Sequence, residues 1–163
     1  MVFVVLGTWG MPFARPLREI ERAAAAGLLA QPIIVQSGCT TYTSPHLQVV
    51  PFFSADEMER MYDSATLVVC QAGVGSIMLG LRKHKTIIAI ARRAAYDEHI
   101  DDHQLEILDV FSKLGSVLPW RGEGDLPEVL ARAGDFAPVP YPFGEEKISR
   151  TILEFLVANV SAR

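Results

Sequence analysis

The feature that most constrains the fold of this chain is an alternation of short apolar runs with longer segments of helical periodicity. The runs are mostly β-branched, and several are continuously apolar, as is typical of strands buried on both faces of a sheet. They are Val2–Leu6, Ile33–Gln36, Leu47–Val50, Leu67–Cys70, Thr86–Ile90 and Ser116–Leu118. Helical spacing of apolar residues lies in Phe13–Leu29, Ala55–Tyr62, Gly75–Arg82, Asp101–Leu114 and Leu126–Ala133. This order predicts an α/β fold, a Rossmann-like parallel sheet with helices on both faces.

The chain has 163 residues, enough for one such domain and too few for two full-sized ones. Near its end, the run from Phe136 to Phe143 is too rich in proline for a helix or a central strand, so we expect an extended connector. A final helix is predicted over Glu145–Val160, with apolar residues on one face. We therefore expect a sheet domain over residues 1–143 and a C-terminal helix over 144–163.

Composition narrows the class of protein. The formal net charge of −4 argues against nucleic acid as a partner, because proteins that bind phosphate backbones usually carry a basic surplus. Cys39 and Cys70 form no CxxC motif and are too few for a disulfide scaffold, which favours a reducing, cytoplasmic compartment. The start, Met1–Leu6, lacks the basic segment of a signal peptide. The uncharged stretch from Ala23 to Ala55 is broken by proline and glycine, so no membrane-spanning helix is predicted.

Three loops of small and polar residues come directly after predicted strands, where open α/β sheets bind their ligands. They are Gly7–Gly10, Gln36–Thr41 and Gln71–Ser76. In the third loop, glycines allow a phosphate close to the backbone and Ser76 adds a hydroxyl donor. A tight strand-to-helix turn without a ligand explains the pattern equally well. No Gly-Lys-Ser/Thr follows, and Met78 replaces the third glycine of a dinucleotide fingerprint, so an ATPase and an NAD enzyme are disfavoured.

A fourth segment, Arg92–Gln104, is the densest polar cluster in the chain. His99 and His103 are four residues apart, as in zinc motifs, but no glutamate follows the first histidine and no third ligand is evident. We therefore predict no metal site. Asp101 and Asp102 can cap the following helix. Imidazoles, an amide and carboxylates crowded at one strand end are more typical of recognition of a hydroxyl-rich ligand than of a cap alone.

These motifs together resemble the C-terminal, donor-binding half of family 28 glycosyltransferases. The resemblance rests on the run from Asp63 to Ser76 with its Ala-Gly-Val-Gly-Ser sequence, on Leu81–Ile88, and on Asp102-His-Gln-Leu-Glu106. Gly7-Thr8 also resembles the family's first loop. The chain is most similar to the short soluble subunits of bacterial two-component exopolysaccharide transferases. Their basic pair, Glu-His pair and Asp-His-Gln triplet are matched by Arg92-Arg93, Glu98-His99 and Asp102-His103-Gln104.

The resemblance implies one half of a GT-B glycosyltransferase that binds a UDP-sugar donor without a cofactor or metal ion. The sugar would pass, with inversion, to a lipid-linked saccharide acceptor in exopolysaccharide or capsule synthesis. A membrane-associated, acceptor-binding partner subunit would hold this chain at the inner face of the plasma membrane. The substrate-binding residues implied, together with their neighbours in the same motifs, are Gly7, Thr8, Gln71, Ala72, Gly73, Gly75, Ser76, Asp102, His103 and Gln104.

The sequence does not decide which residue acts as the catalytic base. Glu98 and His99 are the local candidates, although hydrogen bonding to the donor sugar or capping also explains them, and the base can equally lie on the partner chain. Several relatives carry a ribose-binding glutamate where this sequence has Leu79, so the ribose contact is either missing or made elsewhere.

Two other functions remain as alternatives to a transferase subunit. One is a nucleotide-binding accessory protein without catalysis of its own, which enhances a partner transferase; the other is an oxidoreductase or regulator on the same kind of sheet. The mean hydropathy of +0.23 is high for a small soluble domain. We interpret the surplus as a face for the partner that includes Ile152, Phe155 and Leu156 of the final helix, with packing of that helix on its own sheet as the alternative.

Overall fold

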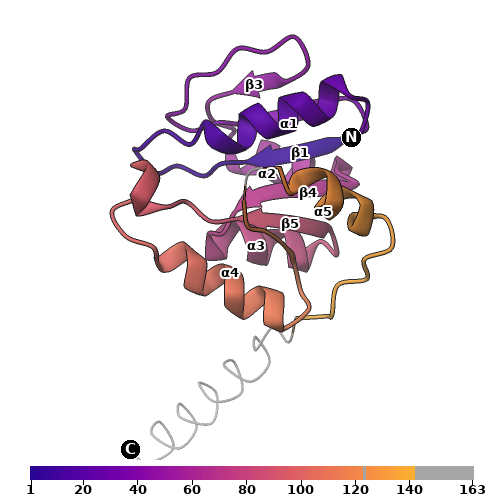
Figure 1. Ribbon diagram of the computed structural model, residues 1–163. Coiled ribbons are helices and arrows are strands. Elements are labelled where there is room, and N and C mark those ends of the chain that lie inside the picture. Colours follow the sequence, from indigo (N-terminus) through magenta and orange to yellow (C-terminus); the bar gives the residue numbers. More distant parts are fainter. Residues whose placement is uncertain (123, 142–163) are drawn as a thin grey trace, which may run out of the picture.

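The computed structural model describes residues 1–122 and 124–141, which form one six-stranded parallel sheet (Figure 1). The spatial order of the strands is β3-β2-β1-β4-β5-β6. The order changes direction between β1 and β4, and open α/β sheets bind ligands at such a switch point. The strands are β1 (Val2–Val5), β2 (Ile33–Gln36), β3 (Gln48–Val50), β4 (Leu67–Gln71), β5 (Thr86–Ile90) and β6 (Leu118–Trp120).

Helices cover both faces of the sheet, which confirms the predicted fold class (Figure 1). The helices are α1 (Arg15–Ala25), α2 (Ala55–Ser64), α3 (Val74–Arg82), α4 (His103–Lys113) and α5 (Leu126–Ala133), with a 3-10 turn η1 (Ala94–Tyr96). α1 and α5 pack on one face, and α2, α3 and α4 pack on the other. Val2 and Val4 of β1 point to the first layer, whereas Phe3 and Val5 point to the second, because successive strand residues face opposite sides.

Helix α1 is shorter than the predicted Phe13–Leu29 at both ends. Phe13 stays outside the helix because its ring is buried and its amide donates to Oγ1 of Thr40 at 2.9 Å. At the other end, Gly27 adopts a positive φ of 71°, and the Leu28 amide donates to the Ala23 carbonyl at 2.9 Å. This is the Schellman arrangement that ends a helix on glycine.

Two other predicted boundaries are wrong by a few residues. The last strand is Leu118–Trp120 rather than Ser116–Leu118, because a strand at the sheet edge tolerates Pro119. Helix α4 begins at His103, and the Asp101 carboxylate lies outside the helix and accepts the His103 amide at 3.1 Å. The Asp101 carboxylate therefore accepts from the first residue of the helix, whereas Asp102, the N-cap residue, makes no side-chain cap hydrogen bond.

The segment after α5 forms neither helix nor strand over residues 135–141, as expected of the extended connector. The Val139 amide donates to the Gly115 carbonyl at 3.0 Å, and Tyr141 lies against Phe111 with 5.7 Å between ring centroids. The rest of the predicted connector, Pro142 and Phe143, and the predicted C-terminal helix over 144–163 lie outside the described residues.

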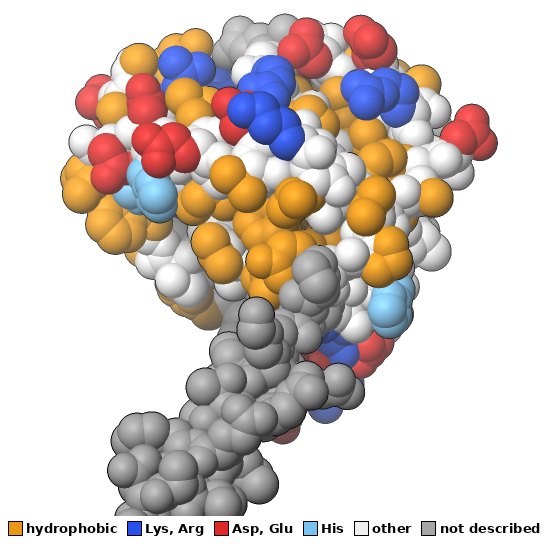
Figure 2. Space-filling model, turned by 90° about the horizontal axis from the view of Figure 1, so that it is seen from below, with side chains coloured by type: hydrophobic (Ala, Val, Ile, Leu, Met, Phe, Trp, Pro, Cys, Tyr) orange, Lys and Arg blue, Asp and Glu red, His pale blue; other side chains and the backbone are white. Residues whose placement is uncertain are grey.

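The face formed by α4 and this segment carries exposed apolar side chains. Val110, Leu114 and Val139 are each about half exposed. Figure 2, which views the molecule from this side, shows hydrophobic side chains gathered in the middle of the face. Part of the apolar surplus of the sequence therefore lies on the surface. Within the described ranges, no helix is both long and apolar enough to cross a membrane.

Candidate functional site

A cavity of about 350 Å³ opens at the carboxyl end of the sheet, beside the switch point. This volume is at the lower end of the range for ligand pockets. The cavity brings the loop after β1 together with the loop after β4. Six of the predicted substrate-binding residues line it: Gly7, Thr8, Gln71, Gly73, Gly75 and Ser76.

The glycines of the two loops have different tasks. Gly7 has a φ of +77°, and a Cβ there would overlap the Gln71 amide, so only glycine lets the loops approach this closely. A Cβ at Gly73 would lie 3.1 Å from Nε2 of Gln71. A Cβ at Gly75, in contrast, would meet no atom within 4 Å and would project into free space. The packing of the fold therefore does not require glycine at position 75, and a side chain there would enter the space beside the cavity lining.

The start of α3 provides hydrogen-bond donors at the cavity. Gly73 is its N-cap and has no side chain to accept from the first turn, whose amides include those of Gly75 and Ser76. Unpaired amides and the helix dipole make such an end attractive to an anion. Ala72 is fully buried and does not line the cavity, so it supports the loop from behind.

Apolar side chains form part of the cavity wall, and the sequence singled out only Leu79 among them. They are Phe52, Phe53, Met58, Tyr62 and Leu79. Tyr62 donates from its hydroxyl to the Ser76 carbonyl at 2.9 Å, and burial raises its pKa far above the ordinary value, so it stays neutral. The two phenylalanines follow β3 after one intervening residue, Pro51, and their position near a strand end was the available signal. Leu79 presents an apolar side chain here in place of a carboxylate.

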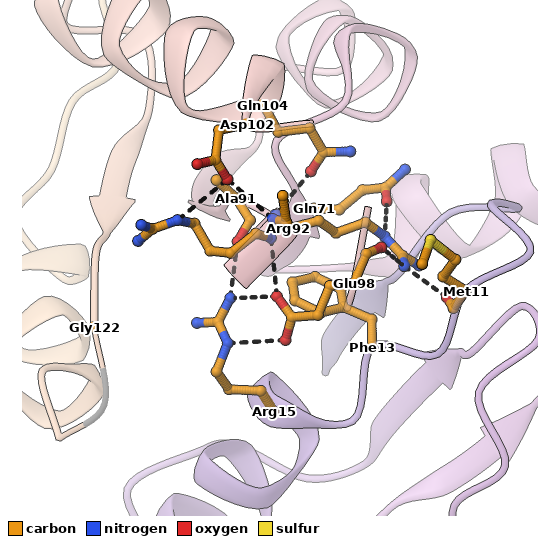
Figure 3. Close-up of polar contacts among 12 residues, drawn as sticks. Met11, Phe13, Arg15, Gln71, Ala91, Arg92, Glu98, Asp102, Gln104 and Gly122 are labelled. Carbon is orange, nitrogen blue, oxygen red and sulfur yellow. Dashed lines mark hydrogen bonds and ion pairs between the residues drawn. The ribbon is translucent and has the colours of Figure 1, made fainter. Parts of the chain in front are cut away.

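Arg92 is the centre of the polar network beside the cavity (Figure 3). It is 1% exposed, and its guanidinium donates to Oε1 of Gln71 at 2.8 Å and to the carbonyls of Met11, Glu98 and Leu6 at 2.7 to 3.0 Å. Burial lowers its pKa to about 10, which leaves it charged at neutral pH. One side chain thus holds the ends of β1, β4 and β5 together.

Glu98 forms a buried, two-pronged ion pair with Arg15 (Figure 3). Nε and Nη2 of Arg15 donate to the two carboxylate oxygens at 2.9 and 2.8 Å, and the Arg93 amide donates to the same carboxylate at 3.0 Å. Glu98 is 4% exposed. This geometry is that of a structural ion pair rather than of a general base, which needs free access to an acceptor hydroxyl.

The Asp102–Gln104 triplet lies outside the cavity lining, although the sequence grouped it with the glycine loop. Oε1 of Gln104 accepts the Arg92 amide at 3.0 Å, and Oδ1 of Asp102 accepts the Ala94 amide at 3.0 Å. His103 is exposed, with Nδ1 3.2 Å from Oε2 of Glu106. Gln104 and Asp102 thus fix the loop between β5 and α4.

The other local candidate for the base, His99, packs between a tryptophan and a carboxylate. Its ring stacks on Trp9 at 4.7 Å between centroids, and Nδ1 lies 2.9 Å from Oδ1 of Asp101. His99 and His103 therefore contact different carboxylates. In the part of the chain that the structure describes, no three metal-ligating side chains are grouped together.

Residues 1–133 match the family model of the glycosyltransferase family 28 C-terminal domain. The chain belongs to this family. It is 31% identical over 142 residues to the UDP-N-acetylglucosamine transferase subunit ALG13 of Eremothecium gossypii, a match that covers 85% of this chain and 68% of that protein. The protein of the same name from Candida albicans is 29% identical over 77 residues, or 47% of this chain and 25% of that one.

Solved structures agree on the fold. The NMR structure of an ALG13 protein has a TM-score of 0.54 and 22% identity, with 86% of this chain and 88% of that chain covered. The crystal structure of MurG from Acinetobacter baumannii has a TM-score of 0.53 and 19% identity, covering 81% of this chain and 40% of that chain. These likenesses confirm the prediction of one half of a GT-B fold. The exopolysaccharide context and the bacterial source implied by the family resemblance are not supported, because these two relatives are fungal.

Proposed function

We propose that this chain is the donor-binding subunit of a two-component inverting glycosyltransferase that uses a UDP-sugar and a lipid-linked saccharide acceptor. The observation that carries the proposal is the cavity at the switch point, in which Gly75 leaves open space beside the first amides of α3. The similarity to the fungal relatives, which are named as subunits of a UDP-N-acetylglucosamine transferase, supports a UDP-sugar as donor.

In such a reaction an acceptor hydroxyl attacks the anomeric carbon, the bond from that carbon to the diphosphate breaks, and UDP leaves with the electron pair. The amides at the start of α3 would bind the diphosphate and stabilise the charge that develops on it. The proton of the acceptor hydroxyl needs a base, and the Arg15–Glu98 ion pair occupies the carboxylate that the sequence offered. This favours a base on the partner subunit or at His99.

Isothermal titration calorimetry with UDP and UDP-sugars tests donor binding. Gly75→Asp places a carboxylate in the open space where the diphosphate is expected, and like charges there should lower the affinity about a hundredfold. Gly134→Asp is the matched control, because its Cβ also meets no atom and it lies near the end of α5, away from the cavity. Equal affinity of the two variants for UDP would refute the proposed site.

The need for a partner is tested by measuring sugar transfer with and without a candidate membrane-associated subunit. Turnover only with both chains supports a two-component enzyme, whereas turnover by the partner alone that this chain merely enhances would favour the accessory function. We further propose that residues 144–163 dock on that subunit, held at the cytoplasmic side of a membrane. Truncation before Glu145 should weaken complex formation more than UDP binding, and equal losses of both would contradict this docking.

A further inference from the structure

Trp9 is a large aromatic residue left 40% exposed at the carboxyl edge of the sheet. Tryptophan is highly buried on average in folded proteins. It follows Thr8, which lines the candidate donor cavity. Trp9 thus belongs to the loop after β1 that supplies Gly7 and Thr8 to the cavity lining, and its exposed indole is open to a ligand.

The indole is held in place from one side. The His99 ring covers it with 4.7 Å between centroids and 24° between planes. His99 is fixed in turn by Asp101, whose carboxylate oxygen and amide lie 2.9 and 3.3 Å from Nδ1. Because Oδ1 of Asp101 also accepts the His103 amide, this support is anchored to the start of α4. Trp9 is therefore a pre-oriented surface rather than a loose side chain.

We propose that Trp9, supported by His99 and Asp101, is the platform on which the pyranose ring of the donor sugar stacks. A pyranose has an apolar C–H face that fits an indole and a rim of hydroxyls that needs polar partners. Exposed His103 lies at the same helix start. A cavity of about 350 Å³ is small for an entire nucleotide sugar, so the nucleotide fills the cavity and the sugar lies over its rim.

This inference rests on the proposed donor site, and it makes a different prediction. Trp9 should contribute to the affinity for a UDP-sugar and not to the affinity for UDP. Calorimetry is done on the full chain with UDP, UDP-N-acetylglucosamine, UDP-glucose, UDP-galactose and UDP-glucuronate. For the sugar nucleotide that binds best, Trp9→Ala should lower the affinity about tenfold while UDP affinity stays within about twofold.

Two further variants sharpen the test. Trp9→Phe keeps an aromatic face and should keep most of the sugar-dependent affinity. Tyr96→Ala removes another exposed aromatic ring from the same edge, one that lies over Arg15, and should change neither affinity. Fluorescence gives a second readout, because the other tryptophan, Trp120, is buried. The UDP-sugar should change the emission of the natural chain and leave that of Trp9→Phe unchanged.

The outcomes separate the two proposals. If the natural chain binds none of the nucleotides, the donor site itself is refuted and the platform with it. If UDP binds but no UDP-sugar binds more tightly, or if Trp9→Ala weakens UDP and UDP-sugar equally, only the platform is refuted. The platform is supported if Trp9→Ala loses the difference in affinity between UDP-sugar and UDP while Trp9→Phe and Tyr96→Ala keep it.

Discussion

Replacing Glu98 by alanine should show whether this residue holds the fold together or acts in catalysis. The substitution removes three short hydrogen bonds, two from Arg15 and one from the Arg93 amide. Arg15 would still donate to the Ala91 carbonyl at 2.9 Å but would lose the Glu98 carboxylate with which it forms its ion pair. A buried guanidinium without a counter-charge is costly, because neither water nor another ion replaces the lost one.

The expected cost is about 3–5 kcal/mol in the free energy of unfolding, the usual range for breaking one side of a buried ion pair. For a chain of this size, such a loss lowers the melting temperature by about 6 to 20 °C. Urea denaturation followed by circular dichroism measures it directly. Glu106→Ala is the control, because Glu106 is an exposed carboxylate near His103 and its removal should change stability by less than about 0.5 kcal/mol.

A double variant shows how much of the loss of stability comes from the missing Arg15–Glu98 attraction and how much from the unpaired charge left on Arg15. Replacing both partners, Arg15→Met with Glu98→Leu, removes the buried charges together and should recover much of the loss. The reasoning would be refuted if Glu98→Ala lost less than about 1 kcal/mol. If that stable variant had also lost sugar transfer with its partner subunit, Glu98 would be the catalytic base after all.

Three further predictions concern the cavity and its surroundings. Gly75→Ala should bind UDP more weakly than Gly134→Ala in calorimetry while both unfold alike, because neither added Cβ meets protein atoms; a stability loss confined to Gly75→Ala would contradict this. Arg92→Met should destabilise the chain by several kcal/mol in urea, since it strips donors from Gln71 and three carbonyls. Burial and the Glu21 carboxylate raise the pKa of Tyr42 to about 12. The raised pKa stabilises the folded chain below pH 10, the ordinary pKa of tyrosine, and this stabilisation is lost between pH 10 and 12. In Tyr42→Phe, the free energy of unfolding should therefore fall less steeply with pH over that range.

The sheet could be predicted from sequence because its signal is local. Runs such as Ile33–Gln36 and Thr86–Ile90 match the observed strands, since burial on both faces requires continuous apolar residues. The start of α1 was missed because it depends on the Thr40 side chain of another loop, which accepts the Phe13 amide. The bounds of β6 were missed because they depend on the position of this strand at the sheet edge. Contacts between segments that are distant in the sequence do not change the local spacing of apolar residues, so that spacing cannot predict them.

The glycine loops of the site were also predictable, because a glycine that must lie close to another backbone is visible as a residue type. The apolar wall around Phe52 and Tyr62 was not predictable in the same way, since its residues look like ordinary core. Glu98 shows where residue type alone leaves two roles open. Its place beside His99 in a polar cluster suggested catalysis, but the cluster also contains the buried contacts that hold the loop.

The electrostatic character of the proposed donor site depends on the hydrogen-bond partners of the Arg92 guanidinium. The guanidinium donates to the neutral oxygens of one amide and three carbonyls, and the nearby Glu98 carboxylate is paired with Arg15. The Arg92 guanidinium is therefore hydrogen-bonded, but no direct ion pair with another described residue neutralises its positive charge. Gln71 accepts from Arg92 and lines the cavity, so the positive potential of the guanidinium adds to that of the α3 start on an anion bound there. Arg92, which holds three strand ends together, would thus also favour the diphosphate in the proposed site where they meet.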